Sequence, residues 1–107
     1  MSIFPRSTPI SSEKTLTFTY TNDTYRIEVT SETKLRWTQL RGDNPGSGDD
    51  EDYVFNELAG GLALITWIEA DGLGLSNVLD PATGTLTTHA NMGREVFQNL
   101  GAFALSP

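Results

Sequence analysis

Apolar and polar residues alternate along most of this chain, in segments separated by short turns. In "TLTFTYT" (residues 15–21), Leu16, Phe18 and Tyr20 fall on one side and four threonines fall on the other. The segments "YRIEVT" and "LRWTQL" repeat this pattern. A repeat of two residues is that of a β-strand with one buried face. The sequence therefore predicts an all-β fold of antiparallel strands joined by tight turns.

The turn signals divide the chain into seven predicted strands. They begin at Leu16, Tyr25, Leu35, Tyr53, Leu62, Leu73 and Thr85. Residues 41–52, "RGDNPGSGDDED", are rich in glycine and acid and are expected to form a loop. Residues 94–100 are expected to form one short C-terminal helix ended by Gly101, with "AFAL" as a candidate last strand.

The strand over residues 62–69 is apolar on both faces, which a half-solvated sheet would not show. One face carries Ala63, Ile65 and Trp67, and we expect it to line a core or cavity. The other face needs a second partner, either the predicted helix or another copy of the chain. A closed meander barrel gives the inward face a core or cavity to line, and its closure removes the sheet edges. A β-sandwich is the alternative, and a homodimer is expected.

Length and charge narrow the classes of protein further. The 107 residues suggest one domain, over residues 14–107, preceded by a flexible lead-in over residues 1–13. The net charge is −7, and the seven Lys and Arg residues are scattered, which argues against nucleic acid and anionic membranes as partners. The chain has no cysteine, and its N-terminus lacks the apolar stretch of a signal peptide, so we expect a cytoplasmic protein.

Three segments, in this order and spacing, resemble the MoaF-like family of calycin-like barrels. They are "KTLTFTYTNDTYRIEVTSETKLRWTQLRG", "YVFNELAGGLALITWIEADG" and "LSNVLDPATGTLTT". The chain also resembles, more distantly, the bacterial phenolic acid decarboxylases. The resemblance implies a small antiparallel calycin- or lipocalin-like meander barrel with a central pocket for a small molecule.

In the decarboxylases, two tyrosines of the first strand and an arginine position the substrate, and a glutamate two residues after a Trp transfers the proton. Carried over by position, the glutamate is Glu69 and one tyrosine is Tyr20. The other tyrosine is replaced by Phe18, and the region of residues 48–52 has no arginine. The resemblance therefore implies the barrel and its pocket, but not that reaction.

Glu69 is also the leading catalytic candidate from the residues themselves. It shares a strand face with Ile65 and Trp67, and if that face points inward the carboxyl is partly desolvated. A carboxyl whose pKa is raised in this way is a usable general acid or base. Tyr20 is expected to donate a hydrogen bond to the ligand. The residues expected to contact the ligand are Phe18, Tyr25, Trp37, Ile65, Trp67 and His89.

No cofactor and no metal are expected. His89 is the only histidine and needs carboxylate partners to bind a metal, and the acidic stretch does not have EF-hand spacing. The partner expected is a small hydrophobic or aromatic molecule. Three functions remain open: a cofactor-free isomerase, cyclase or lyase that works by proton transfer, a non-catalytic lipocalin-like binder, and a barrel filled by its own side chains.

Overall fold

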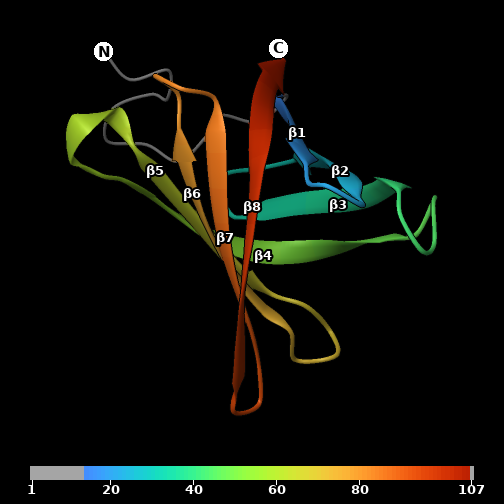
Figure 1. Ribbon diagram of the computed structural model, residues 1–107. Helices are drawn as coiled ribbons and strands as arrows, with labels where there is room; N and C mark the ends of the chain where they lie inside the picture. Colours follow the sequence, from blue (N-terminus) through green and yellow to red (C-terminus); the bar gives the residue numbers. More distant parts are fainter. Residues whose placement is uncertain (1–13, 107) are drawn as a thin grey trace.

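A computed structural model describes residues 14–106, and these residues form eight β-strands that close into a barrel (Figure 1). The strands are β1 (Thr15–Thr19), β2 (Thr24–Val29), β3 (Lys34–Arg41), β4 (Gly48–Glu57), β5 (Ala63–Ile68), β6 (Gly74–Asp80), β7 (Thr85–Met92) and β8 (Glu95–Ser106). A single 3₁₀ turn, η1 (Ala59–Gly61), joins β4 to β5 within the described chain. The predicted lead-in over residues 1–13 lies outside the described residues.

Each strand pairs antiparallel with the next one in the sequence, and β8 returns to pair with β1. This order is an up-and-down meander, and its closure leaves no free first or last strand. The predicted meander barrel is therefore confirmed, and the alternative of a sandwich is wrong. Among the described residues, no helix is long and apolar enough to cross a membrane.

The predicted C-terminal helix is wrong, because residues 94–100 belong to a hairpin. β7 and β8 pair from Thr85↔Ala102 to Met92↔Glu95, which leaves Gly93 and Arg94 as a two-residue turn. Gly93 has φ of 59°, the left-handed conformation that such tight hairpin turns require. The apolar residues Val96, Phe97 and Leu100 of "REVFQNL" have a spacing that resembles a helical stripe. All three are exposed in the structure, so this spacing does not mark a buried helix face.

The predicted acidic loop is wrong over half its length. Gly48–Asp52 begins β4, and only residues 42–47 connect β3 to β4. The acidic residues form a strand because basic residues of β3 face them: Lys34 pairs with Asp52, and the Arg36 guanidinium lies 3.3 Å from the Asp50 carboxylate. Opposite charges facing each other across a strand pair favour the sheet.

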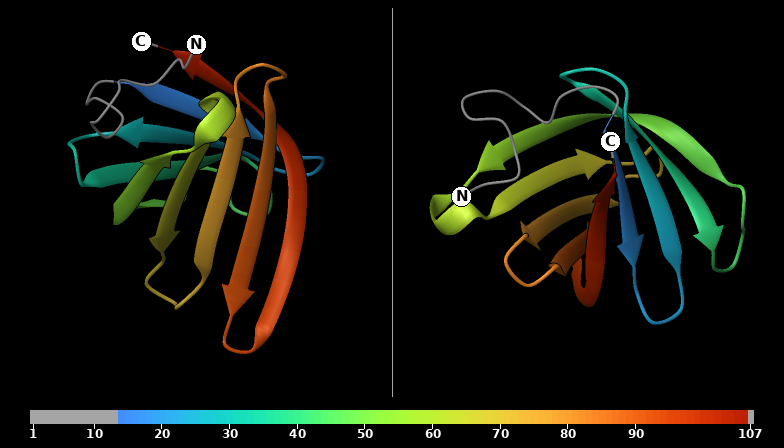
Figure 2. Two further views of the ribbon diagram at one scale, coloured as in Figure 1. Left: turned by 90° about the vertical axis from the view of Figure 1, so that its left-hand side faces the viewer. Right: turned by 90° about the horizontal axis from the view of Figure 1, so that it is seen from above.

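Side chains fill one end of the barrel. The buried core residues at the end near η1 are Leu16, Val29, Leu35, Tyr53, Ala63, Ile65, Leu79 and Leu86. The turns that follow β1, β3, β5 and β7 lie at the other end, and the turns after β5 and β7 are seen side by side in Figure 2. The candidate functional site lies at this second end, which we call the open end.

The two faces of β5 differ in burial. Ala63, Ile65 and Trp67 point inward and are at most 4% exposed, as the sequence predicted. On the outer face, Ile68 is 66% exposed, and Val54 of the neighbouring β4 is 64% exposed. Among the described residues no helix covers these two side chains, and both are exposed to solvent. The expected homodimer, which would cover them, stays a prediction.

Candidate functional site

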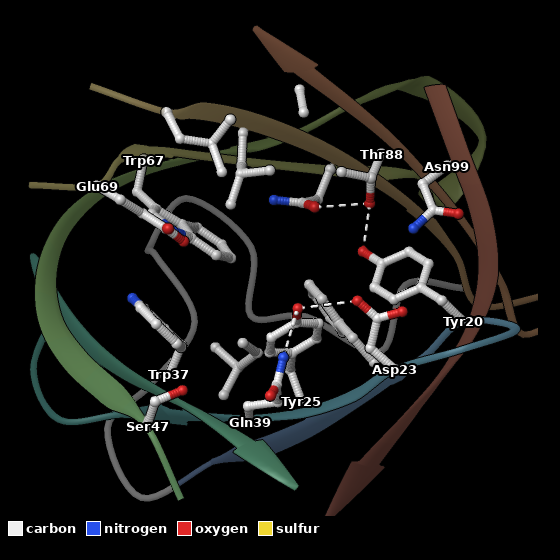
Figure 3. A pocket seen from close by; sticks show the side chains of 16 residues that line it. Tyr20, Asp23, Tyr25, Trp37, Gln39, Ser47, Trp67, Glu69, Thr88 and Asn99 are labelled. Carbon is white, nitrogen blue, oxygen red and sulfur yellow. Dashed lines mark hydrogen bonds between the residues drawn. The ribbon is translucent and has the colours of Figure 1, made fainter. Parts of the chain in front are cut away.

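A cavity of about 220 Å³ occupies the open end of the barrel (Figure 3). Its residues come from all the strands except β4, together with the turns between them. They are Phe18, Tyr20, Asp23, Tyr25, Ile27, Trp37, Gln39, Ser47, Trp67, Glu69, Leu73, Leu75, Asn77, Thr88, Ala90 and Asn99. An apolar cavity of about 150 Å³ is enough to hold benzene, so this one has room for a substituted single ring.

A chain of buried hydrogen bonds fixes the direction of the Tyr20 hydroxyl proton. Asn77 donates through Nδ2 to the Ile65 carbonyl at 3.0 Å, so its Oδ1 faces Thr88. Thr88 therefore donates its only hydroxyl proton to Asn77 Oδ1, at 2.8 Å. Tyr20, whose hydroxyl lies 2.6 Å from Thr88 Oγ1, must be the donor to Thr88. The expected role of Tyr20 as a donor to the ligand therefore conflicts with this arrangement, which leaves Tyr20 an acceptor.

Burial has a second consequence for Tyr20. Desolvation by burial raises the pKa of the Tyr20 phenol to about 12. The phenol is therefore neutral at physiological pH. Tyr20 contributes a fixed, uncharged oxygen to the cavity wall.

Gly101 allows Tyr20 to reach Thr88. Both β1 and β7 pair with β8, so the Tyr20 side chain crosses β8 to reach the Thr88 hydroxyl. A Cβ atom on Gly101 would lie 2.3 Å from the Thr19 carbonyl oxygen and 2.9 Å from the Tyr20 ring. Gly101 was expected to end a helix. In the structure it is a strand residue that leaves space for the Tyr20 ring.

A second chain of hydrogen bonds holds Tyr25. Gln39 accepts from the backbone N–H of Asn44 at 2.5 Å, so its amide nitrogen is directed at Tyr25 Oη, 3.1 Å away. Tyr25 in turn donates to the Asp23 carboxylate at 3.0 Å. Edge-to-face packing of the Tyr25 ring with Tyr20 and Trp37 completes this wall.

Glu69 lies on the opposite side of the cavity from Tyr20, beside Trp67 and Trp37 (Figure 3). Its Oε2 accepts a hydrogen bond from the Trp67 indole N–H at 3.3 Å. Burial raises the pKa of the Glu69 carboxyl, and the Trp67 hydrogen bond lowers it only in part. The nearby carboxylates of Glu51, Asp71 and Asp49 raise the pKa further. Glu69 is thus a half-buried carboxyl with a single, long hydrogen bond.

The structure brings most of the predicted site residues together. Glu69, Tyr20, Phe18, Tyr25, Trp37 and Trp67 all line the cavity. Ile65 is part of the core below the cavity and contributes its carbonyl to Asn77. His89 is exposed on the outer face of β7, because its neighbour Thr88 points inward. The structure therefore does not place Ile65 or His89 in contact with a ligand in the cavity.

Several polar residues of the cavity were missed. Asn77, Thr88, Gln39 and Asp23 form the two hydrogen-bond chains. The alternation of "LSNVLD" and "TLTTHA" does place Asn77 and Thr88 on the same strand faces as Leu79 and Leu86, and this is the signal that was available. Within the described chain, no group of three or more His, Cys, Asp or Glu residues could hold a metal ion.

The fold and the site together define an eight-stranded antiparallel meander barrel with a ligand-sized cavity at one end. The chain belongs to the MoaF-like family, whose family model matches residues 12–103. No protein with a curated description matches it. A solved structure named "Crystal Structure of a putative beta-lactamase from Burkholderia vietnamiensis" is similar to it, with 22% identity and a TM-score of 0.80, over 92% of this chain and 98% of that chain. At this identity the likeness supports the fold alone.

Proposed function

We propose that this protein binds a small organic molecule, about the size of a substituted single ring, in the barrel cavity. The observation that supports this proposal best is that side chains do not completely fill the open end of the barrel. They leave a cavity of about 220 Å³ whose walls combine aromatic rings with hydrogen-bonded polar groups. Cavities that are mostly apolar and have a few fixed polar groups are typical of small-molecule sites.

The two hydrogen-bond chains support a site that is formed before the ligand arrives. Tyr20, Thr88 and Asn77 hold one another on one side, and Tyr25, Gln39 and Asp23 do so on the other. Side chains fixed in this way lose little conformational freedom on binding, which favours affinity. A barrel that serves only as an interaction module would not need two hydrogen-bond chains around a cavity.

Intrinsic fluorescence tests the proposal directly, because both tryptophans of the chain, Trp37 and Trp67, line the cavity. We expect small ring compounds to change this fluorescence in a saturable way. Ala90 lines the cavity, and Ala102 is an exposed residue of β8. Ala90→Leu should occupy part of the cavity and weaken binding by about tenfold or more. A tenfold change corresponds to about 1.4 kcal/mol of binding free energy. Ala102→Leu, the matched control, should leave binding unchanged, and equal effects of the two variants would contradict the proposal.

The second candidate function is proton transfer by Glu69 to or from the bound molecule. It is favoured by the position of Glu69 in the cavity wall and by the raised pKa of its carboxyl. A positioned carboxyl with a pKa closer to neutrality is a more effective acid or base. Because the Tyr20 proton is committed to Thr88, Glu69 would act without a donor from Tyr20.

This second candidate can be tested without knowing the reaction. A bound compound with an acidic C–H is kept in D₂O with the protein, and the loss of that proton signal is followed by NMR. Exchange that depends on the protein and disappears in Glu69→Gln would support proton transfer. Binding without exchange would leave a non-catalytic binder.

A further inference from the structure

The charges in the cavity are all of one sign. Among the described residues that line it, Asp23 and Glu69 carry carboxylates, and none is Lys, Arg or His. Asp23 already accepts a hydrogen bond from the Tyr25 hydroxyl at 3.0 Å. Glu69 has only the 3.3 Å hydrogen bond from Trp67, although a carboxylate has room for about four. Each of the two carboxylates thus accepts one hydrogen bond, and the longer, weaker one belongs to Glu69.

Arg41, Arg36 and Lys34 do not line the cavity, and each has a partner of its own. Arg41, at the open end, donates to the backbone carbonyls of Thr21 and Tyr20. Arg36 and Lys34 pair with the acidic residues of β4 on the outside of the barrel. A ligand carboxylate would enter a partly desolvated site with no positive charge to pair with, which is unfavourable.

A second hollow adjoins the cavity where β4 and β5 separate. The two strands pair only from Tyr53↔Trp67 to Glu57↔Ala63. The charged residues that line the hollow are Asp50, Glu51, Asp52 and Lys34, and Trp67 lines both the hollow and the cavity. Lys34 and Arg36 pair with Asp52 and Asp50. The Glu51 carboxylate, which accepts a hydrogen bond from the Trp37 indole N–H at 3.0 Å, therefore adds negative charge beside the cavity wall and favours cations there.

We propose that the cavity selects a cation: a protonated or quaternary amine on a small aromatic body, with its positive charge against the Glu69 carboxylate. This inference rests on the proposed binding function and names its ligand class. Trp67 and Trp37 lie beside Glu69 in Figure 3, and indole rings attract cations through their π faces. The aromatic body would lie against Phe18 and Ile27, two of the buried apolar residues that line the cavity.

Three probes of similar shape and different charge test the proposal by tryptophan fluorescence at pH 7: benzylamine, benzyl alcohol and benzoate. We expect benzylamine to bind at least tenfold more tightly than benzyl alcohol, and benzoate to bind most weakly. Equal binding of benzylamine and benzyl alcohol, or tighter binding of benzoate, would overturn the inference and leave the proposed function standing. If none of the three binds while a wider set of neutral ring compounds also fails, the proposed function itself falls.

Variants then locate the charge. Glu69→Gln keeps the shape of the side chain. It should weaken the binding of benzylamine at least tenfold, while the affinity for benzyl alcohol changes less than twofold. Glu32→Gln removes the same charge from the exposed turn between β2 and β3, at the other end of the barrel, and should change neither. Equal losses for benzylamine in the two variants would show a general charge effect and contradict the assignment to Glu69.

The pH dependence gives an independent readout. Benzylamine affinity should fall as the pH is lowered through the pKa of Glu69, and benzyl alcohol affinity should not change. The titratable groups that act on the Glu69 carboxyl are Glu51 and Asp49 of β4, Asp71 of the turn between β5 and β6, and Tyr25 of β2. In Glu69→Gln the pH dependence should disappear. A dependence that persists in this variant would assign the cation to another carboxylate.

Discussion

The hydroxyl oxygens of Tyr20 and Thr88 lie 2.6 Å apart, although the two residues are 68 positions apart in the sequence. Tyr20 directly follows β1 and Thr88 lies in β7, the two strands that flank β8, and the space left by Gly101 allows the contact. Because Thr88 donates onward to Asn77, the Tyr20 proton is directed at Thr88 Oγ1. This contact therefore connects the closure of the barrel with the chemistry of its cavity.

The first prediction concerns the stability of this contact. Thr88→Val leaves both the Tyr20 hydroxyl and Asn77 Oδ1 without their partner, and Asn77 is 1% exposed. We expect a loss of about 2–4 kcal/mol, since each buried polar group left unpaired costs about 1–3 kcal/mol. Tyr20→Phe removes only one donor and should cost about 1 kcal/mol.

Urea unfolding followed by circular dichroism measures both losses. Thr87→Val is the matched control, because Thr87 is the neighbouring residue on the opposite face of β7. It should change the free energy of unfolding by less than about 0.5 kcal/mol. If Thr88→Val costs no more than Thr87→Val, the buried chain of hydrogen bonds is not formed in solution.

The second prediction is that no tyrosine of the folded protein ionises at its ordinary pH. Burial raises the pKa of all three tyrosines of the chain, Tyr20, Tyr25 and Tyr53, and that of Tyr20 to about 12. Absorbance at 295 nm should therefore show less than half of the tyrosinate signal of the unfolded chain at pH 10. Because the unfolded state loses its protons first, the free energy of unfolding should fall as the pH rises from about 10 toward 12. A normal titration would contradict this account of the cavity walls.

The third prediction concerns Glu69 and pH. The pKa of its carboxyl is raised in the fold, mainly by desolvation, so the folded state favours the protonated form. The resulting penalty appears as the pH rises through the unfolded value, about 4.3, and is complete above the folded value. Glu69→Gln removes it and should stabilise the protein near pH 7 by less than about 1 kcal/mol, since the group is partly solvated.

The gain should be absent below pH 4, where Glu69 is protonated in both states. Urea unfolding of the two proteins at pH 3.5, 5 and 7 gives the difference directly. A Glu69→Gln variant that is less stable than the parent protein at pH 7 would show that the charged form is favoured, which would contradict the direction of the pKa shift.

The fourth prediction is the homodimer. Val54 and Ile68 expose apolar surface side by side on β4 and β5, next to the hollow between these strands. We expect sedimentation at micromolar concentration to give about twice the 11.7 kDa mass of one chain. Val54→Lys should shift the mass toward the monomer, and Val96→Lys, which changes an even more exposed valine on β8, should not. A monomer in the unmodified protein would rule the dimer out.

The alternation of apolar and polar residues along the chain was sufficient to predict most of the barrel. Leu16, Phe18 and Tyr20 face inward as the pattern required, and Trp67 and Glu69 share the cavity wall. The pattern failed for residues 94–100, because apolar residues occupy both faces of β8 and only the turn at Gly93 distinguishes a hairpin from a helix.

The polar part of the site was harder to predict for a different reason. Asn77 and Thr88 lie inward only because they satisfy each other and the Ile65 carbonyl across strands. Such partners are set by the register of the barrel, which one sequence does not contain. Composition alone also suggested that the acidic residues 48–52 were too polar to order, and the ion pairs with Lys34 and Arg36 explain why they form a strand.

The most direct test of the account is an NMR titration of the ¹⁵N-labelled protein with benzylamine. The two indole N–H signals, from Trp37 and Trp67, report on the cavity wall next to Glu69. We predict that both shift in a saturable way, together with the backbone amides of Tyr20 and Thr88, and that the indole shifts are weakened in Glu69→Gln. Shifts confined to the outer face around Val54 and Ile68, or no saturable shift with any ring compound, would contradict a ligand site in the barrel.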